Sequence, residues 1–259
     1  MKLEILLRTC NKSENNPDMT RIIKVSRDEL ILRCLKSLIT SLNLASLASS
    51  YKISFTLIDD STNEFARRIK SLWSSVICDK TYLSLELNNN ESMKYCYEYA
   101  KDKFEEESVI YFAEDDYLYF PNCFEEMINA YELFKHNLGG EVAIHPADSP
   151  LEYFPDALKS PYSASRIVLG RDRHWRTCVS SPFTLMISKK AFTKHYKKFM
   201  DYSKWDGVNF HEANTINLMF IDNVKLFTPI PTLAFHLGYI NPPAPFCDHI
   251  KLWEDNKCN

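Results

Sequence analysis

The first half of the chain alternates between two spacings of apolar residues. Short apolar runs with strand character occupy residues 3–8, 53–58, 82–87 and 108–113. Between them, apolar residues recur every three or four positions, which predicts helices over 31–42, 65–76 and 93–104. This order of strands and helices predicts an α/β fold with a mostly parallel central sheet flanked by helices.

The second half of the chain is less regular. We expect a helix over 121–134, an irregular proline-rich stretch over 145–161, a strand at 183–187 and helices over 188–200 and 210–220. The tail from 228 to 253 is rich in proline and aromatic residues and shows no clear period. Because no linker interrupts the pattern, we predict a single domain over residues 1–259 with two halves, 1–120 and 121–259.

The most informative segment is an acidic triplet that follows the fourth predicted strand. Glu114, Asp115 and Asp116 come directly after the apolar run 109–113. Three like charges at the end of a buried strand repel one another and resist desolvation, so we expect a divalent cation to compensate them. In an extended chain, Glu114 and Asp116 could face that cation while Asp115 faces away from it, or Asp115 could hydrogen-bond a ribose or the backbone. The alternative is a solvated turn with acids near a helix N-terminus.

The other predicted strands of the first half also end in polar residues. Thr9 and Asn11 follow the first strand, Asp59 and Asp60 the second, and Asn88 to Asn90 the third. Ligands of parallel sheets bind at these carboxyl ends, so either aspartate could accept hydrogen bonds from a ribose or a base, or Asp60 could cap a helix instead. The first glycine is Gly139, so no glycine-rich loop precedes it to bind a phosphate.

Several residues of the second half are candidates for further roles. Asp206 and Glu212 are possible general bases, although either could equally belong to a turn or a helix start. His236 could be a third metal ligand or a core histidine. A basic cluster surrounds Trp175 and could bind a diphosphate or an acidic acceptor, or line a solvated loop; it consists of Arg171, Arg173, His174 and Arg176.

Composition excludes some classes of protein. A chain of 259 residues that is 45% hydrophobic can bury a large core, and a net charge of −3 without a basic run argues against nucleic acid as a partner. The eight cysteines show no metal-like spacing and are expected to be reduced thiols. The N-terminus is too charged for a signal peptide, and we expect no transmembrane segment. The predicted location is the cytoplasm, in solution or in peripheral contact with a membrane.

Together these motifs resemble the GT-A-type glycosyltransferases, in particular the family-2-like inverting enzymes. The resemblance implies a GT-A-like, Rossmann-type sandwich, with 1–120 binding a nucleotide-sugar donor and 121–259 binding a glycan, lipid-linked or protein acceptor. The matching segments are Leu7-Arg8-Thr9-Cys10-Asn11, Asp59-Asp60-Ser61, Glu114-Asp115-Asp116 in place of the family's DxD motif, the 121–134 helix and the strand and helix at 183–192.

The resemblance also implies roles for individual residues. Mn²⁺ or Mg²⁺ would sit on Asp116, with Glu114 or Asp115 assisting and His236 completing the site. The nucleoside would contact Asp59 or Asp60, near Thr9 and Asn11, and Asp206 or Glu212 would be the catalytic base. Two alternatives remain: a sugar nucleotidyltransferase, which usually has the glycine-rich loop absent from 1–138, and a non-catalytic nucleotide- or glycan-binding module.

Overall fold

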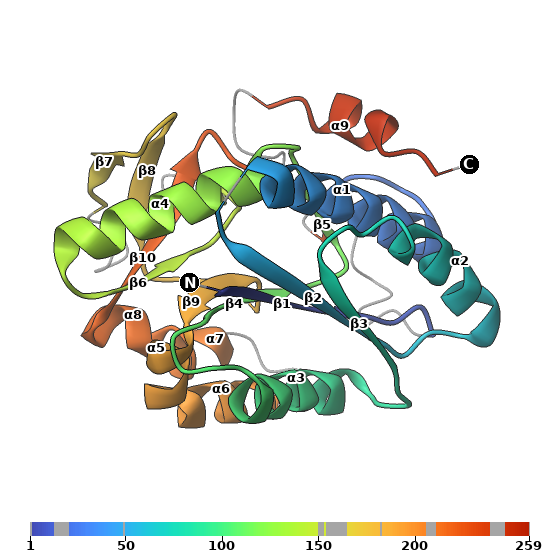
Figure 1. Cartoon of the computed structure of the whole chain (residues 1–259), viewed down its shortest axis with the longest axis horizontal. Coiled ribbons are helices and arrows are strands. Elements are labelled where there is room, and N and C mark those ends of the chain that lie inside the picture. The colour runs from blue at the N-terminus through green and yellow to red at the C-terminus, as the bar shows by residue number, and fades with distance from the viewer. Residues whose placement is uncertain are drawn as a thin grey trace.

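A computed structural model describes residues 2–12, 21–48, 50–149, 153, 165–181, 183–205, 211–238 and 247–258. Its centre is a nine-stranded sheet in the order β3-β2-β1-β4-β9-β6-β10-β8-β7, with helices on both faces (Figure 1). Strands β8 and β9 run antiparallel to their neighbours, and the remaining described strands of this sheet share one direction. The predicted fold class, a mostly parallel sheet flanked by helices, is confirmed.

The bounds of the elements follow the chain. The strands of the large sheet are β1 (Lys2–Thr9), β2 (Lys52–Asp59), β3 (Asp79–Ser84), β4 (Val109–Ala113), β6 (Glu141–Ile144), β7 (Ile167–Leu169), β8 (His174–Cys178), β9 (Leu185–Ser188) and β10 (Val224–Ile230). A two-stranded ribbon pairs β5 (Tyr117–Tyr119) with β11 (Ala234–His236). The helices are α1 (Arg27–Ala48), α2 (Asn63–Trp73), α3 (Asn89–Lys103), α4 (Cys123–Leu138), α5 (Lys189–Lys194), α6 (Tyr196–Tyr202), α7 (His211–Asn214), α8 (Leu218–Asp222) and α9 (His249–Asp255).

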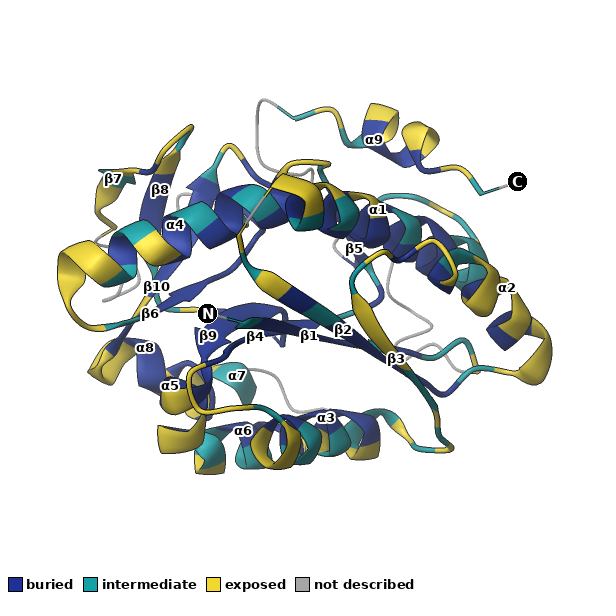
Figure 2. Cartoon of the chain, viewed as in Figure 1, coloured by how far each residue is buried: buried dark blue, intermediate teal, exposed yellow. Residues whose placement is uncertain are grey.

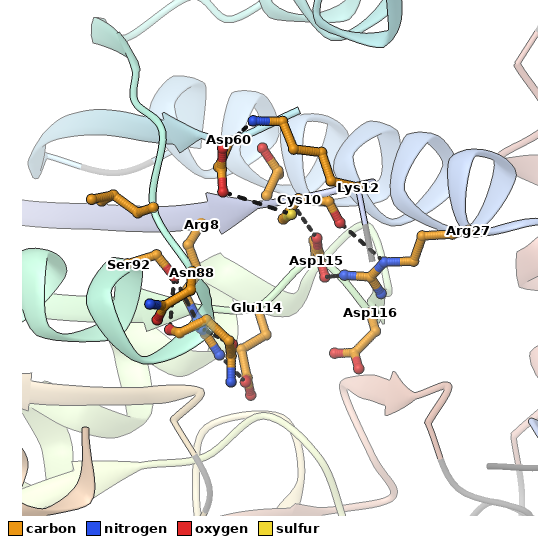
Figure 3. Close-up of a pocket in the computed structure, with 13 residues that line it drawn as sticks. Arg8, Cys10, Lys12, Arg27, Asp60, Asn88, Ser92, Glu114, Asp115 and Asp116 are labelled. Atoms are coloured by element: carbon orange, nitrogen blue, oxygen red, sulfur yellow. Dashed lines mark hydrogen bonds and ion pairs between the residues drawn. The ribbon is translucent and has the colours of Figure 1, made fainter. Parts of the chain in front are cut away.

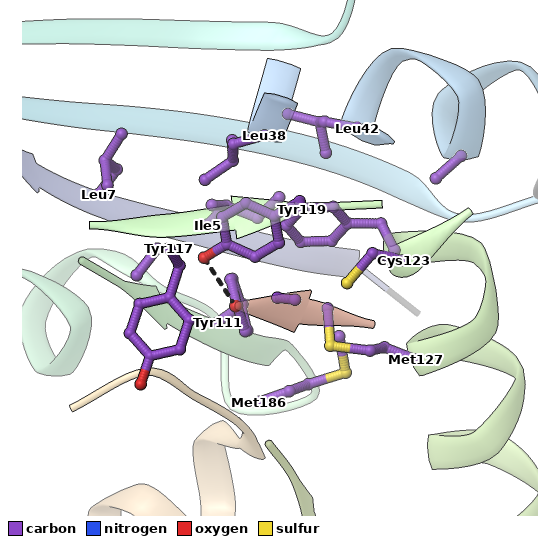
Figure 4. Packing of buried hydrophobic residues seen from close by; sticks show 14 of the residues in the cluster. Ile5, Leu7, Leu38, Leu42, Tyr111, Tyr117, Tyr119, Cys123, Met127 and Met186 are labelled. Atoms are coloured by element: carbon purple, nitrogen blue, oxygen red, sulfur yellow. Dashed lines mark hydrogen bonds between the residues drawn. The ribbon is translucent and has the colours of Figure 1, made fainter. Parts of the chain in front are cut away.

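Alternation of side chains along the central strands creates a separate core on each face of the sheet. On β1, Ile5 and Leu7 pack on the side of α1 and α4, whereas Leu6 packs on the side of α3. Figure 4 shows the first core, in which the hydroxyls of Tyr111 and Tyr119 share a hydrogen bond of 3.0 Å. The dark band of buried residues through the middle of Figure 2 is this sheet with the inner faces of its helices.

Helix α1 is long and apolar enough to meet the length and composition test for a membrane span. Within the described residues it is the one helix that does so. However, 67% of the 18-residue window that meets this test is buried inside the fold. Two of its buried serines, Ser37 and Ser41, accept hydrogen bonds from the backbone N–H groups of Tyr119 and Phe124. These contacts are typical of the core helix of a globular domain.

Polar residues at two strand ends begin the following helices. The Thr62 side chain caps α2, and Asn88 forms a capping box with Glu91 at the start of α3. The expected alternative that Asp60 caps this helix is therefore wrong, because Thr62 provides the cap.

Other sequence expectations needed correction. The third strand ends at Ser84 rather than at 87, because its partner β2 ends at Asp59, which pairs with Ser84. The helix expected over 188–200 divides at His195, and that over 210–220 divides into α7 and α8. Strands β5, β6, β7, β8, β10 and β11 were missed, since most of them are short and most pair with partners distant in sequence.

A cluster of aromatic rings holds α3, α5 and α6 to the lower face of the sheet. Phe112 of β4 lies between 5.3 and 6.0 Å from four other rings, those of Tyr97, Phe183, Phe192 and Phe199. Phe112→Ala should lower the free energy of unfolding by about 3–5 kcal/mol because it leaves a cavity in this cluster. Urea unfolding measures this change. Leu218→Ala, at a half-exposed site, is the control and should change stability little.

Candidate functional site

The carboxyl ends of β1, β2 and β4 meet at one edge of the sheet and surround a pocket. Its volume is about 230 Å³. Its walls come from the ends of these strands, the N-terminus of α1 and the N-terminus of α3 (Figure 3). All three residues of the acidic triplet line it. The position agrees with the rule that ligands of open α/β sheets bind beyond the carboxyl ends of the strands.

Glu114 is held by an arginine from the neighbouring strand. Nη2 of Arg8 donates to Oε1 of Glu114 at 3.0 Å, and the hydroxyl of Thr184 donates to Oε2 at 3.3 Å. Arg8 is fixed in turn by Asn89, whose Oδ1 accepts from Nη1 at 2.5 Å, and by the ring of Phe183 beneath its guanidinium. Both carboxylate oxygens of Glu114 are therefore already occupied by protein donors.

Asp115 is bound to the loop after β1 and to the first residue of α1. Its Oδ2 accepts from the backbone N–H of Cys10 at 3.1 Å, and its Oδ1 accepts from Nη2 of Arg27 at 2.6 Å. Arg27 also donates from Nε to the carbonyl of Cys10 at 3.2 Å. Of the two roles expected for Asp115, the structure shows hydrogen bonding to the backbone.

Asp116 lies against His236, from the far end of the chain. Antiparallel pairing of β5 with β11 places Tyr117 opposite His236, and Nε2 of His236 lies 3.1 Å from Oδ2 of Asp116. The rings of Tyr117 and His236 stack at 4.7 Å between centroids. Gly238 leaves room for the imidazole of His236, because a Cβ at position 238 would lie 3.0 Å from Cε1 and Nε2 of that ring. Oδ1 of Asp116 is buried and has no hydrogen-bond partner within the described part of the chain.

The three acids differ in their pKa values. Burial raises the pKa of Glu114 and of Asp115, although Arg8 and Arg27 oppose this rise. Burial acts in the same direction on Asp116, but His236, Arg27 and Arg8 together lower its pKa to about 2. Asp116 therefore stays ionised across the physiological range.

The predicted nucleoside ligands have different environments. Asp59 is fully buried, and both its oxygens are taken, by the hydroxyl of Thr9 at 2.9 Å and by the hydroxyl of Tyr82. Asp60 lines the pocket and pairs with Nζ of Lys12 at 2.6 Å. Asn11 donates to Asp28 at 2.9 Å and accepts from the N–H of Thr62 at 2.9 Å. These last contacts tie the end of β1 to the starts of α1 and α2.

Neither candidate base is among the described residues that line the pocket. Asp206 lies outside the described residues. The carbonyl of Trp205 accepts a hydrogen bond from Nδ2 of Asn90 at 2.6 Å, which holds Trp205 beside the start of α3. Glu212 lies in the first turn of α7, half-buried, and does not line the pocket.

Two arginines of the cluster around Trp175 form ion pairs inside the fold. They neither stand free to bind a diphosphate or an acidic acceptor nor line a solvated loop, the two roles expected for them. Arg173 binds Glu126 of α4, and Nη2 of Arg176 lies 2.6 Å from Oδ1 of the buried Asp148. Trp175 itself is buried.

The donor atoms present fit a divalent cation only in part. Among the described residues, no group of three or more His, Cys, Asp or Glu is placed to hold a metal ion. Asp116 with its unpartnered Oδ1 and the adjacent imidazole of His236 form a two-ligand set. Such a set fits Mg²⁺ or Mn²⁺ when substrate phosphates supply further oxygens. Glu114 is committed to Arg8 and Thr184.

Sequence reasoning missed the cations of the pocket, which are Arg8, Lys12 and Arg27. A signal existed for Arg8, since an arginine at the end of an apolar strand needs an acidic partner. Arg27 gave no such signal, because it lies in a polar segment and its partner is 88 residues away.

The Arg8–Glu114 pair allows a double-mutant test. The side chains of Arg8 and Glu114 are only 12% and 20% exposed. Arg8→Met should lower the free energy of unfolding by about 3 kcal/mol, because it leaves a buried carboxylate without its cation. The double variant with Glu114→Gln should be more stable than Arg8→Met. Denaturant unfolding of the four proteins measures the coupling, and purely additive changes would contradict the pairing.

A buried histidine next to the site should make stability depend on pH. His145 donates from Nδ1 to the carbonyl of Thr184 at 2.7 Å, and its ring contacts Tyr117. Burial lowers the pKa of His145 from 6.5 to about 4. The unfolded chain therefore binds more protons between these values, and stability falls as the pH drops through this range. The loss attributable to His145 at pH 5 should be about 2 kcal/mol.

His145→Asn removes the titrating group and keeps a donor for Thr184. The difference in melting temperature between pH 7.5 and pH 5 should be smaller for this variant than for the wild type. An equal difference would show that His145 does not titrate in this way.

Comparisons with known proteins support the fold. No protein-family model matches the chain, and no curated protein sequence matches it. Among solved structures, S. aureus TarS 1-349 is similar with a TM-score of 0.52 and 12% identity. The match covers 88% of this chain and 60% of TarS 1-349, so the chain spans less than two thirds of that structure.

Two more distant structural matches have names that refer to sugar or nucleotide chemistry. The glycosyltransferase GlyE of Streptococcus pneumoniae TIGR4 gives a TM-score of 0.45 at 13% identity, over 87% of this chain and 44% of GlyE. The 4-diphosphocytidyl-2C-methyl-D-erythritol synthase of Anaerococcus prevotii gives 0.44 at 11% identity, over 98% and 94%.

Proposed function

We propose that this protein is a glycosyltransferase that moves a sugar from a nucleoside-diphosphate sugar to an acceptor hydroxyl. The observation that carries the proposal is the state of Asp116. It lies at the carboxyl edge of the parallel sheet and stays ionised, and its Oδ1 is buried without a described partner. Glu114 and Asp115 beside it are paired with arginines. A buried oxygen of this kind favours a ligand that completes it.

Asp116 and His236 would hold a divalent cation, Mn²⁺ or Mg²⁺. Carboxylate oxygen and imidazole nitrogen both suit Mn²⁺, and Mg²⁺ is often bound by one or two carboxylates together with substrate phosphates. When bound, the ion would neutralise charge on the departing nucleoside diphosphate. The absence of glycine before Gly139 supports this arrangement, because no glycine-rich loop is available for the phosphates.

The nucleoside would bind on the side of the pocket formed by β2. Asp60 lines the pocket and is our candidate to accept hydrogen bonds from a ribose or a base. Asp59 would have a structural role next to Asp60, because both oxygens of Asp59 accept hydrogen bonds from Thr9 and Tyr82. Lys12, paired with Asp60, would also lie near the donor.

The reaction would be a direct displacement at the anomeric carbon. The acceptor hydroxyl would give its proton to a carboxylate and form the new carbon–oxygen bond as the bond to the diphosphate breaks. Asp206 and Glu212 remain the two candidates for this base. Glu212 does not line the pocket, and Asp206 is the other candidate that the sequence offers. A glycan, a lipid-linked sugar or a protein would supply the hydroxyl.

A thermal-shift screen of UDP-, GDP-, CMP- and dTDP-sugars, with and without Mn²⁺, tests the proposal. We expect one nucleotide class to raise the melting temperature in a manganese-dependent manner. Donor hydrolysis measured with that sugar should fall at least about 100-fold in Asp116→Asn, because the variant loses the proposed ligand charge. Asp222→Asn removes an exposed acid of α8 and is the matched control.

Other outcomes would favour different functions. Wild-type hydrolysis rates in Asp116→Asn would contradict the proposal. Pyrophosphate release from a nucleoside triphosphate and a sugar phosphate would support a sugar nucleotidyltransferase. Manganese-dependent binding without turnover on any acceptor would support a binding module.

A further inference from the structure

Arg27 begins α1 and places its guanidinium in the pocket between two segments of the site. Two of its nitrogens are used, Nε on the carbonyl of Cys10 at 3.2 Å and Nη2 on Asp115 at 2.6 Å. Its Nη1 has no hydrogen-bond partner among the described residues. The Arg27 side chain is 15% exposed and lines the pocket, so the N–H groups of Nη1 are available to a ligand there.

The other two cations of the pocket are less suitable for an anion beside Asp116. Both terminal nitrogens of Arg8 are used: Nη1 donates to Asn89 and Ser92, and Nη2 donates to Glu114. Lys12 pairs with Asp60, at the β2 side of the pocket. Nε of Arg8 also has no partner among the described residues, but it is sealed from solvent. Of the three cations, Arg27 therefore combines a fixed position with an unused N–H group that is open to the pocket.

Arg27 also lies within electrostatic range of Asp116. Figure 3 shows its guanidinium bound to Asp115, with the Asp116 carboxylate nearby. Burial raises the pKa of Asp116, whereas His236 and, after it, Arg27 lower it. A diphosphate that completes a cation site on Asp116 would therefore come close to this guanidinium.

We propose that Arg27 binds a phosphate of the donor's diphosphate group, an inference that rests on the proposed function. A planar guanidinium pairs with phosphate oxygens through parallel, charge-assisted hydrogen bonds. The positive N-terminal end of the 22-residue helix α1 adds favourable potential at the same place. The pocket would thus hold the diphosphate between a metal on Asp116 and a guanidinium, where other nucleotide-binding folds use glycine-rich loops.

Arg27 could instead act only by holding Asp115 and the loop at Cys10. This positioning role and the proposed binding role differ in what Asp115→Asn should do. If Arg27 merely positions the loop, loss of its carboxylate partner should resemble loss of Arg27. If Arg27 binds phosphate, Asp115→Asn leaves the guanidinium in place with fewer competing bonds.

The experiment is calorimetric titration of the full chain with inorganic pyrophosphate in the presence of Mn²⁺. Arg27→Gln should weaken binding about 10-fold to 100-fold, the size expected for a lost charge-assisted contact. Arg27→Lys should recover part of the affinity. Asp115→Asn should lose several-fold less affinity than Arg27→Gln. Arg68→Gln removes an exposed arginine near Asp28 and controls for the change in net charge.

The outcomes separate this inference from the proposed function. Wild-type affinity in Arg27→Gln, or equal losses in Arg27→Gln and Arg68→Gln, would overturn the role of Arg27 and leave the proposed function standing. Equal losses in Arg27→Gln and Asp115→Asn would reduce Arg27 to a positioning residue and overturn the inference. No pyrophosphate binding by the wild type would contradict both. Melting temperatures of all variants confirm that each is folded.

Discussion

The structure depends on compensating three adjacent carboxylates at the end of a buried strand. Each acid has its own partner: Arg8 for Glu114, Arg27 for Asp115, and the imidazole of His236 for Asp116. These partners come from β1, from the start of α1 and from β11 near the end of the described chain. Charge compensation therefore ties three distant segments to one point at the sheet edge. Unpaired, these buried carboxylates would each cost several kcal/mol.

This arrangement gives the three acids unequal roles. Glu114 and Asp115 act mainly as structural anchors, because their oxygens are occupied by arginine, threonine and backbone donors. Asp116 is held on one side by His236, and its other oxygen is buried without a partner among the described residues. In the proposed function, a single ionised carboxylate beside an imidazole and a partly unused guanidinium would form a compact site for a metal-bound diphosphate.

Much of the fold could be predicted from the sequence, because the first half follows clear periods. Strands β1, β2 and β4 and the three helices between them occupy the expected segments, and their carboxyl ends meet as expected. The second half could not be predicted well. Its short strands pair across long sequence distances, as β10 does with both β6 and β8. The acidic triplet was found from sequence, but its arginine partners were not, since ion pairs between distant segments leave no local pattern.

The account's central claim is that the three acids are not equivalent toward a metal and its diphosphate. Electron paramagnetic resonance of Mn²⁺ in the presence of the accepted nucleoside diphosphate measures this directly, by separating bound from free ion. The account predicts that Asp116→Asn abolishes the bound signal, while Glu114→Gln and Asp115→Asn, confirmed as folded, retain it. A bound signal that survives in Asp116→Asn, or that disappears equally in all three variants, would contradict the claim.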